Sequence, residues 1–156
     1  TNEEWMLAEQ SGKPAWCYYE NDEKNAPQYG KLYNWHAIND PRGLAPEGWH
    51  IPSDAEWKEL SEHLGGATVA SKKMKNTEGW ESNGSGTNES GFKAIPAGFR
   101  KSTGEFSSKG CYALFWSSTE FDENIATYRY LDCTTDELSS FNYLKGDGLS
   151  VRLIKD

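Results

Sequence analysis

The sequence of 156 residues lacks long apolar runs and has fewer basic than acidic residues. No stretch approaches the roughly 20 apolar residues that span a bilayer, so we expect no transmembrane segment. Lys and Arg number 16 against 24 Asp and Glu, which gives a net charge of −8. Because nucleic acids are polyanions, this charge argues against a nucleic-acid partner and favours an acidic, solvated surface.

A secretory leader is also missing from the start of the chain. Such a leader would place basic residues before a short apolar segment, and the opening residues 1–4 do not fit that pattern. The abrupt start looks internal to a longer sequence. We therefore expect that, if the protein is exported, its leader precedes Thr1.

Motifs for catalysis are lacking as well. The histidines His36, His50 and His63 have no His-x-His or His-x-x-x-His spacing, and no cysteine lies close to them in the sequence. A zinc site would have to be assembled wholly by tertiary folding. No Gly-x-Ser-x-Gly motif, phosphate-binding glycine loop or paired-carboxylate pattern is present. We interpret His50 as a packed residue whose ring bonds a backbone carbonyl, and we expect neither catalysis nor a bound cofactor.

Cysteine is scarce, with Cys17, Cys111 and Cys133 making an odd number. At least one of them is therefore unpaired or pairs between molecules. The sequence leaves two interpretations open for Cys111 and Cys133, namely two small buried apolar residues or a disulfide bond.

Aromatic residues are abundant, with seven Trp, eight Tyr and six Phe, and Gly, Ser and Asn are plentiful too. This composition is typical of a loop-rich α+β domain with aromatic anchors and unlike that of a helical bundle. The length fits one domain over residues 1–156 with a substantial core.

The best-specified local structure is a helix at residues 54–64. Ser53 and Glu56 form a capping box, in which each side chain bonds the backbone N–H of the other residue. Trp57, Leu60 and Leu64 then form one apolar stripe, and two glycines follow. A further helix is expected around Leu32 to Asn39, and a short basic one at residues 68–75.

Strands are expected mainly in the C-terminal half, at residues 92–95, 112–119, 126–133 and 149–154, with a hairpin tip at 103–106. In the last of these segments, Leu149, Val151 and Leu153 alternate with polar residues, which indicates one buried face. Near the N-terminus, residues 4–19 suggest two short strands joined by a turn at 12–14.

Residues 76–90 are rich in Gly, Ser, Asn and Thr, which predicts a surface loop that buries only Trp80. Asn83, Asn88 and Glu89 could supply oxygen ligands to Ca²⁺. The segment has no Asp, however, so an ordinary solvated loop is the preferred interpretation.

Several motifs recur in the order of a known family. They lie at residues 5–6 (WM), 29–35 (YGKLYNW), 48–57 (GWHIPSDAEW), 90–100 (SGFKAIPAGFR), 115–120 (FWSSTE) and 148–152 (GLSVR). This ordered set, covering nearly the whole chain, resembles the Fibrobacter succinogenes major paralogous domain family of bacterial surface and secreted proteins. The family in turn resembles the formylglycine-generating-enzyme branch of the C-type lectin-like fold.

The expected elements amount to two main helices followed by a mostly antiparallel, twisted sheet with long loops, in the C-type lectin-like fold that the resemblance implies. The resemblance also implies a bacterial protein that is secreted or displayed on the cell surface, or carried on a phage particle. Many relatives have cysteines where this sequence has Ala45 and Leu153, and the partner expected shortly after Cys17 is also missing. These departures weaken the inference of an oxidising compartment.

The segment at 121–143 is the best candidate for a ligand surface. On a strand, Tyr128, Tyr130 and Asp132 project to one side, which gives an aromatic and acidic face. Tyr, Asn, Ser and Asp suit recognition because Tyr offers large contact area at low entropic cost. The resemblance places the ligand-facing sheet, which retroelements diversify in related domains, in this region. The predicted ligand-binding residues are Trp116, Phe121, Asp122, Glu123, Asn124, Tyr128, Tyr130, Asp132, Ser140, Phe141, Asn142 and Tyr143.

We therefore expect a non-enzymatic binding domain for a protein or glycan. The same face could instead be an ordinary exposed strand with half-buried tyrosines. One alternative function is a structural module of a larger surface complex. Another is a cysteine-dependent oxidase of the formylglycine-generating type, for which only Cys111 and Cys133 could provide the required pair.

Overall fold

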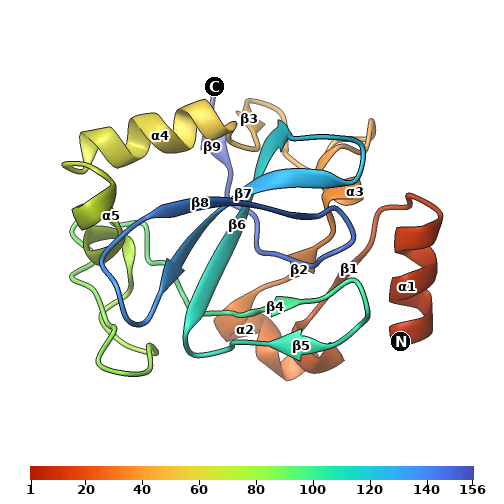
Figure 1. The fold of residues 1–156 in the computed structure, drawn as a ribbon, viewed down its shortest axis with the longest axis horizontal. Coiled ribbons are helices and arrows are strands. Elements are labelled where there is room, and N and C mark those ends of the chain that lie inside the picture. The colour runs from red at the N-terminus through yellow and green to blue at the C-terminus, as the bar shows by residue number, and fades with distance from the viewer.

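The computed structural model describes residues 1–156 and has an α+β architecture (Figure 1). Its helices are α1 (Asn2–Gln10), α2 (Ala26–Tyr29), α3 (Trp35–Ile38), α4 (Asp54–His63) and α5 (Ala67–Met74), with 3₁₀ turns η1 (Tyr19–Asn21) and η2 (Glu23–Asn25). Its strands are β1 (Trp16–Cys17), β2 (Leu32–Tyr33), β3 (Trp49–His50), β4 (Phe99–Arg100), β5 (Phe106–Ser107), β6 (Tyr112–Glu120), β7 (Ile125–Asp132), β8 (Ser139–Leu144) and β9 (Ile154–Lys155).

Strands β6, β7 and β8 form the only three-stranded sheet, an antiparallel meander. Leu114 pairs with Tyr130 across β6 and β7, and Tyr128 pairs with Phe141 across β7 and β8. The short strands form three antiparallel pairs, β1 with β2, β3 with β9 and β4 with β5. The strands expected at 112–119 and 126–133 and the hairpin tip at 103–106 are confirmed. Strand β8 has no counterpart among the expected strands, although Phe141 and Tyr143 alternate there with Ser140 and Asn142.

Helix α4 confirms the capping-box prediction. The Ser53 Oγ accepts a hydrogen bond from the Glu56 N–H at 3.3 Å, and the Glu56 carboxylate accepts one from the Ser53 N–H at 2.8 Å. These bonds satisfy N–H groups that the first helical turn leaves free. The helix lies along one side of the domain and contacts β6 and β7 (Figure 1), with Trp57 buried beneath it.

The basic helical segment and the loop after it are also as expected. Helix α5 occupies nearly the expected residues, and residues 76–90 contain no helix or strand. Trp80 is buried and its indole N–H donates to the carbonyl of Ala94 at 3.2 Å. The Asn88 side chain accepts from the backbone N–H of Lys93 at 2.8 Å. These bonds tie the loop to the segment that follows it.

The N-terminal segment differs from the expected pair of strands. Residues Asn2–Gln10 form α1, because Thr1 and Glu4 make a second capping box. The Thr1 Oγ1 accepts from the Glu4 N–H at 3.2 Å, and Glu4 binds the terminal ammonium at 2.8 Å. Trp5 anchors the helix in the core. Only β1 remains of the expected strands.

The helix expected around Leu32 to Asn39 is also wrong in extent. Leu32 and Tyr33 form β2, which pairs with β1. Asn34 then has an extended backbone, and its side chain accepts from the Ala37 N–H at 3.1 Å. Because Asn34 is an N-cap, the residues before it cannot belong to the helix, and α3 has a single turn.

Two expected strands are wrong. Residues 92–95 have no strand assignment, and of 149–154 only Ile154 lies in a strand, β9. Leu149 is buried whereas Leu153 is exposed, so the alternation does not reflect one buried face. Leu149 and Ser150 instead make single bridges to Tyr33 and Phe115, which attach this segment to two different elements.

The central sheet separates two apolar clusters. Phe115 and Leu131 belong to the cluster under α4 and α5, and Leu114 and Tyr128 belong to the cluster on the opposite face. A third, smaller cluster lies around Trp5 near α1. No helix of the structure has the length and apolar content needed to cross a membrane.

Cys111 and Cys133 are bonded as a disulfide, with 4.7 Å between their Cα atoms, and Cys17 is a buried free thiol. The bond joins the residue before β6 to the residue after β7, so it closes the end of this strand pair. Of the two interpretations left open by the sequence, the disulfide is the one found.

Candidate ligand-binding site

One face of the central sheet carries a cluster of aromatic side chains. Because side chains alternate along a strand, Tyr112 of β6, Tyr128 and Tyr130 of β7, and Phe141 and Tyr143 of β8 all project to the same face. The antiparallel register sets them beside one another on neighbouring strands. We call this face the tyrosine face.

The tyrosine face is hollowed by a cavity of about 410 Å³. Its depth follows from the burial of Tyr128, which is 6% exposed, whereas Phe141 at the edge strand β8 is 64% exposed. The cavity is lined by Phe99, Ser108, Tyr112, Leu114, Tyr128, Tyr130, Phe141 and Tyr143. Concave, mainly apolar sites with a few polar groups are typical of small-molecule binding.

Three ring pairs of the cavity pack at steep angles, whereas the Tyr130 ring is tilted by only 34° to that of Tyr128 and by 38° to that of Tyr112. The ring centroids of Tyr128 and Tyr143 are 5.3 Å apart with an interplanar angle of 84°, and those of Phe99 and Tyr143 are 5.6 Å apart at 83°. Tyr130 lies 5.8 Å from Tyr128, and Phe141 lies 6.5 Å from it. These contacts fix the ring orientations before any ligand arrives.

Two phenol groups of the cavity, those of Tyr128 and Tyr143, have raised pKa values. Burial is the main cause that raises the pKa of Tyr128 and of Tyr143, and the negative charge of Asp147 adds to the rise for both. No hydrogen bond within the protein engages either hydroxyl. The cavity therefore offers aromatic faces together with hydroxyl groups that can bond an incoming ligand.

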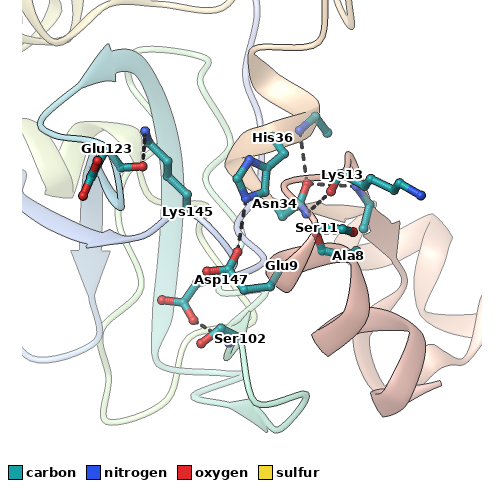
Figure 2. Close-up of polar contacts among 12 residues, drawn as sticks. Ala8, Glu9, Ser11, Lys13, Asn34, His36, Ser102, Glu123, Lys145 and Asp147 are labelled. Atoms are coloured by element: carbon teal, nitrogen blue, oxygen red, sulfur yellow. Dashed lines mark hydrogen bonds and ion pairs between the residues drawn. The ribbon is translucent and has the colours of Figure 1, made fainter.

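A second cavity of about 410 Å³ adjoins the first and shares Tyr143 with it. Its polar lining includes Asp147, which is only 2% exposed. The Asp147 Oδ1 accepts from the Ser102 N–H at 2.6 Å, whereas its buried Oδ2 has no partner (Figure 2). Burial, with a contribution from the charge of Glu9, raises the pKa of Asp147 to about 7.

Helix α1 closes over the loop that carries Asp147. The Glu9 carboxylate lies between this loop and α3, where its Oε2 is 3.2 Å from the Nε2 of His36 (Figure 2). A Cβ atom on Gly146 would lie 2.2 Å from the Glu9 Oε2, so a larger residue there would require the Glu9 side chain to shift. Lys145 is tied separately, through its ammonium to Glu120 and to the carbonyl of Glu123 at 2.8 Å.

The family profile of the Fibrobacter succinogenes major domain matches residues 1–155 of the chain. The chain belongs to this family. No curated protein and no solved structure matches it. The family resemblance inferred from the motifs is therefore confirmed, and the relation of this Fibrobacter succinogenes major domain to the C-type lectin-like fold stays a prediction.

The structure brings four of the twelve predicted ligand residues together in the first cavity: Tyr128, Tyr130, Phe141 and Tyr143. Asn142 projects to the other face of β8, where it accepts from Thr127 at 3.1 Å, and it lines the adjoining cavity. These positions agree with a binding surface on the sheet, although the binding itself stays a prediction.

Two predicted residues are buried away from any surface. The Trp116 indole is fully enclosed and donates to the carbonyl of Tyr33 at 2.7 Å, so it belongs to the core. The Asp132 carboxylate turns into the chain, where it accepts from the N–H groups of Thr134 at 2.7 Å and Thr135 at 2.9 Å. Because Asp132 caps this turn, the face that it shares with Tyr130 is less acidic than expected.

The remaining predicted residues lie elsewhere on the sheet. The segment with Phe121, Asp122, Glu123 and Asn124 joins β6 to β7 at the end of the sheet opposite to the disulfide, and it does not line the cavity. Its Phe121 is 62% exposed. Ser140 lies on the face under α4, where its hydroxyl is 3.4 Å from the Asp54 Oδ1.

Sequence reasoning missed several residues of the cavity: Phe99, Ser108, Tyr112 and Leu114. Tyr112 and Leu114 could have been found, because they alternate on β6, the strand that pairs with β7, and Leu114 lies directly opposite Tyr130. Phe99 and Ser108 come from the β4–β5 hairpin, and no local pattern in the sequence indicates that this hairpin meets the sheet.

The His50 prediction is wrong. Its ring lies between two carboxylates, with Nδ1 2.6 Å from the Asp156 Oδ1 and Nε2 2.7 Å from the Glu56 Oε1. Both contacts raise the pKa of His50, that with Asp156 most. The backbone N–H of Ser53 and the contact with His50 in turn lower the pKa of Glu56 to about 2. No cluster of His, Cys, Asp and Glu suited to a metal ion is found.

Proposed function

We propose that this Fibrobacter succinogenes major domain is a non-enzymatic ligand-binding domain whose site is the cavity of the tyrosine face. The observation that carries the proposal is the concentration of aromatic side chains around a preformed hollow beside the edge strand β8. Tyrosine-rich sites of this kind bind with little loss of side-chain entropy. The occupant is a group presented by a protein or glycan partner.

The disulfide supports a place outside the cytoplasm. Disulfides persist mainly in oxidising compartments, so the bond between Cys111 and Cys133 favours a secreted or surface-displayed bacterial protein, or a phage particle. It also favours binding over cysteine-dependent catalysis, because the thiolate is the reactive form of cysteine. The finer fold proposed is the C-type lectin-like fold, with the C-terminal sheet as a recognition surface open to sequence diversification.

The experiment is a titration of the ¹⁵N-labelled domain with three probe sets, followed by amide shifts. The sets are methyl pyranosides, amides of N-acetylated aromatic amino acids, and small quaternary amines. We expect at least one set to shift the amides of Tyr130 and Phe141. If no set shifts residues of the cavity, the proposal is wrong.

A matched pair of variants tests the location. Phe141 and Phe121 are almost equally exposed, at 64% and 62%, but only Phe141 lines the cavity. Phe141→Ala should weaken binding of the active probe at least about fivefold, whereas Phe121→Ala should leave it unchanged. Both variants should keep the wild-type melting temperature. Equal losses in the two variants would contradict the proposed site.

One observation favours the alternative of an assembly module. Trp49 of β3 and Ile154 of β9 lie on the same strand pair, and both are exposed, as is Leu153 beside them. Exposed apolar groups that gather in one place are typical of protein interfaces. Size-exclusion chromatography with light scattering separates the two functions, because stable self-association lost in Trp49→Ser would favour the module.

A further inference from the structure

Lysine and arginine side chains of this protein lie over aromatic rings in many places. The Lys31 Nζ is 3.7 Å from the centroid of the Trp16 ring, and the Arg100 guanidinium is 4.5 Å from that of Trp5. None of the rings that line the cavity of the tyrosine face has such a partner. The densest group of aromatic rings in the domain is therefore without a cation of its own.

The arrangement of these rings suits a cation. An aromatic ring is electron-rich on its face and electron-poor at its edge, so a cation is attracted to faces and several faces add together. The near-perpendicular pairs of Tyr143 with Tyr128 and with Phe99 turn ring faces toward more than one side of the hollow. The hollow of about 410 Å³ that these rings line leaves room for a methylated ammonium group.

A negative group lies beside the rings. Asp147 lines the adjoining cavity with Tyr143, and its buried Oδ2 has no hydrogen-bond partner. Burial is the main cause that raises the pKa of Tyr128 and of Tyr143, and the negative charge of Asp147 adds to both rises. Lys101, on the same cavity, is held by Glu105 at 3.0 Å and makes no ion pair with Asp147. The buried carboxylate therefore has no ion-pair partner within the protein, and Lys101 is the basic group that lies near it.

We infer that the cavity of the tyrosine face binds an alkylated ammonium group, held by the faces of Tyr128, Tyr130 and Tyr143 and balanced by the carboxylate of Asp147. The inference rests on the proposed function, to which it adds the chemical class of the ligand. The net charge of −8 favours a cation over an anion at long range. A neutral ligand would leave the Asp147 carboxylate without a counter-charge.

The first test compares two probes of the same shape. Choline carries a trimethylammonium group, and 3,3-dimethylbutan-1-ol replaces its nitrogen by carbon and has no charge. Isothermal titration of the domain at pH 8 should show choline binding at least about 10-fold more tightly than the neutral alcohol. Equal affinity of the two probes, or no binding of choline, would overturn the inference.

The second test separates ring faces from ring bulk. Tyr130 is partly exposed, so changes there should not unfold the domain. Tyr130→Phe keeps the aromatic face and should retain choline affinity within about twofold, whereas Tyr130→Leu keeps an apolar group and should lose about fivefold or more. If the two variants bind choline equally, the cation–π contact is absent and the inference falls.

The third test uses pH. A bound cation favours ionised Asp147, so choline affinity should rise as the pH increases from 6 to 8 in the wild type and stay flat in Asp147→Asn. The groups that face this carboxyl are Glu9 on α1 with its partner His36, Lys101 and Ser102 after β4, Tyr143 on β8 and Tyr128 on β7. A pH dependence that persists in Asp147→Asn would assign it to these groups and contradict the role of Asp147.

The probe sets of the amide-shift titration distinguish failure of this inference from failure of the proposed function. Binding of a pyranoside or an aromatic amide in the cavity, with no binding of choline, would overturn the cation assignment and leave the ligand-binding function in place. No shift with any of the three sets would overturn both.

Discussion

The two faces of the β6–β7–β8 sheet differ in how their side chains find partners. On the face under α4 and α5, Leu131 and Phe115 are packed in a core, and the Arg129 guanidinium donates to the Asp54 Oδ1 at 2.8 Å. On the tyrosine face, Tyr128 and Tyr143 keep hydroxyls with no partner in the protein. Both faces pack against an apolar cluster, but only the tyrosine face also has polar groups left over for a ligand.

Neighbouring residues of β7 give the largest expected contrast. Leu131→Ala removes a fully buried side chain from the covered face and should lower the free energy of unfolding by about 2–5 kcal/mol. Tyr130→Ala, one residue away on the tyrosine face, should lower it by less than about 1 kcal/mol because Tyr130 already meets solvent. Denaturant titrations of both variants measure the difference. Equal losses would show that the two faces are not distinct in stability.

Removal of the disulfide between Cys111 and Cys133 tests whether this end of the sheet needs a covalent link for stability. Cys111 and Cys133 are 22 residues apart, and the loss of a cross-link of that span costs about 3 kcal/mol in the chain-entropy account. The double change of both cysteines to Ser should therefore lower stability by about that amount. Cys17→Ser serves as the control for altering a cysteine that is not cross-linked. An unchanged denaturation midpoint after reduction of the wild type would contradict the prediction.

The covered face was the more predictable from the sequence. The capping box of Ser53 with Glu56 and the apolar spacing of Trp57 and Leu60 are local signals, and they fix α4 where the structure has it. The same capping logic applied to Thr1 and Glu4 predicts α1, and the two-strand interpretation of this segment failed because it gave more weight to the aromatic residues than to the cap.

The cavity was predictable only in part. The alternation along β7 places Tyr128 and Tyr130 on one face, and tertiary packing decides that Tyr128 is buried at its base. Trp116 has the same parity, but Trp35 and Leu149 cover it from segments distant in sequence. Asp147 gives no signal in the sequence, because its burial depends on the approach of α1 to Gly146.

The change in stability between pH 4 and 7 tests the effect of Asp147, which lies beside the tyrosine face. The pKa of Asp147 is raised to about 7, well above the ordinary value of an aspartate, so the folded state binds a proton more tightly than the unfolded state. Its contribution is fully present below about pH 4 and is lost as the pH rises to about 7. Asp147→Asn should remove this loss and be more stable than the wild type at pH 8 by about 1–3 kcal/mol.

Thermal unfolding as a function of pH measures this effect. The control is Asp136→Asn, because Asp136 is an exposed aspartate on the covered side, beside Lys75. If the melting temperatures of the wild type and of Asp147→Asn depend equally on pH, burial does not raise the pKa of the Asp147 carboxyl.

A smaller effect of pH on stability is expected from His50, in a higher pH range. The pKa of His50 is raised by Asp156 and Glu56, so the stability that it contributes is present below about pH 6.5, its unfolded value, and is lost as the pH rises through the folded value. His50 is partly exposed, so salt should weaken the effect. His50→Gln should weaken the dependence of the melting temperature on pH above pH 6.5. The control, His63→Gln at an exposed site on α4, should leave this dependence unchanged. If the melting temperatures of the two variants depend on pH with the same slope, the contacts of His50 with Asp156 and Glu56 do not stabilise the protein in solution. Another group would then cause the pH response above pH 6.5.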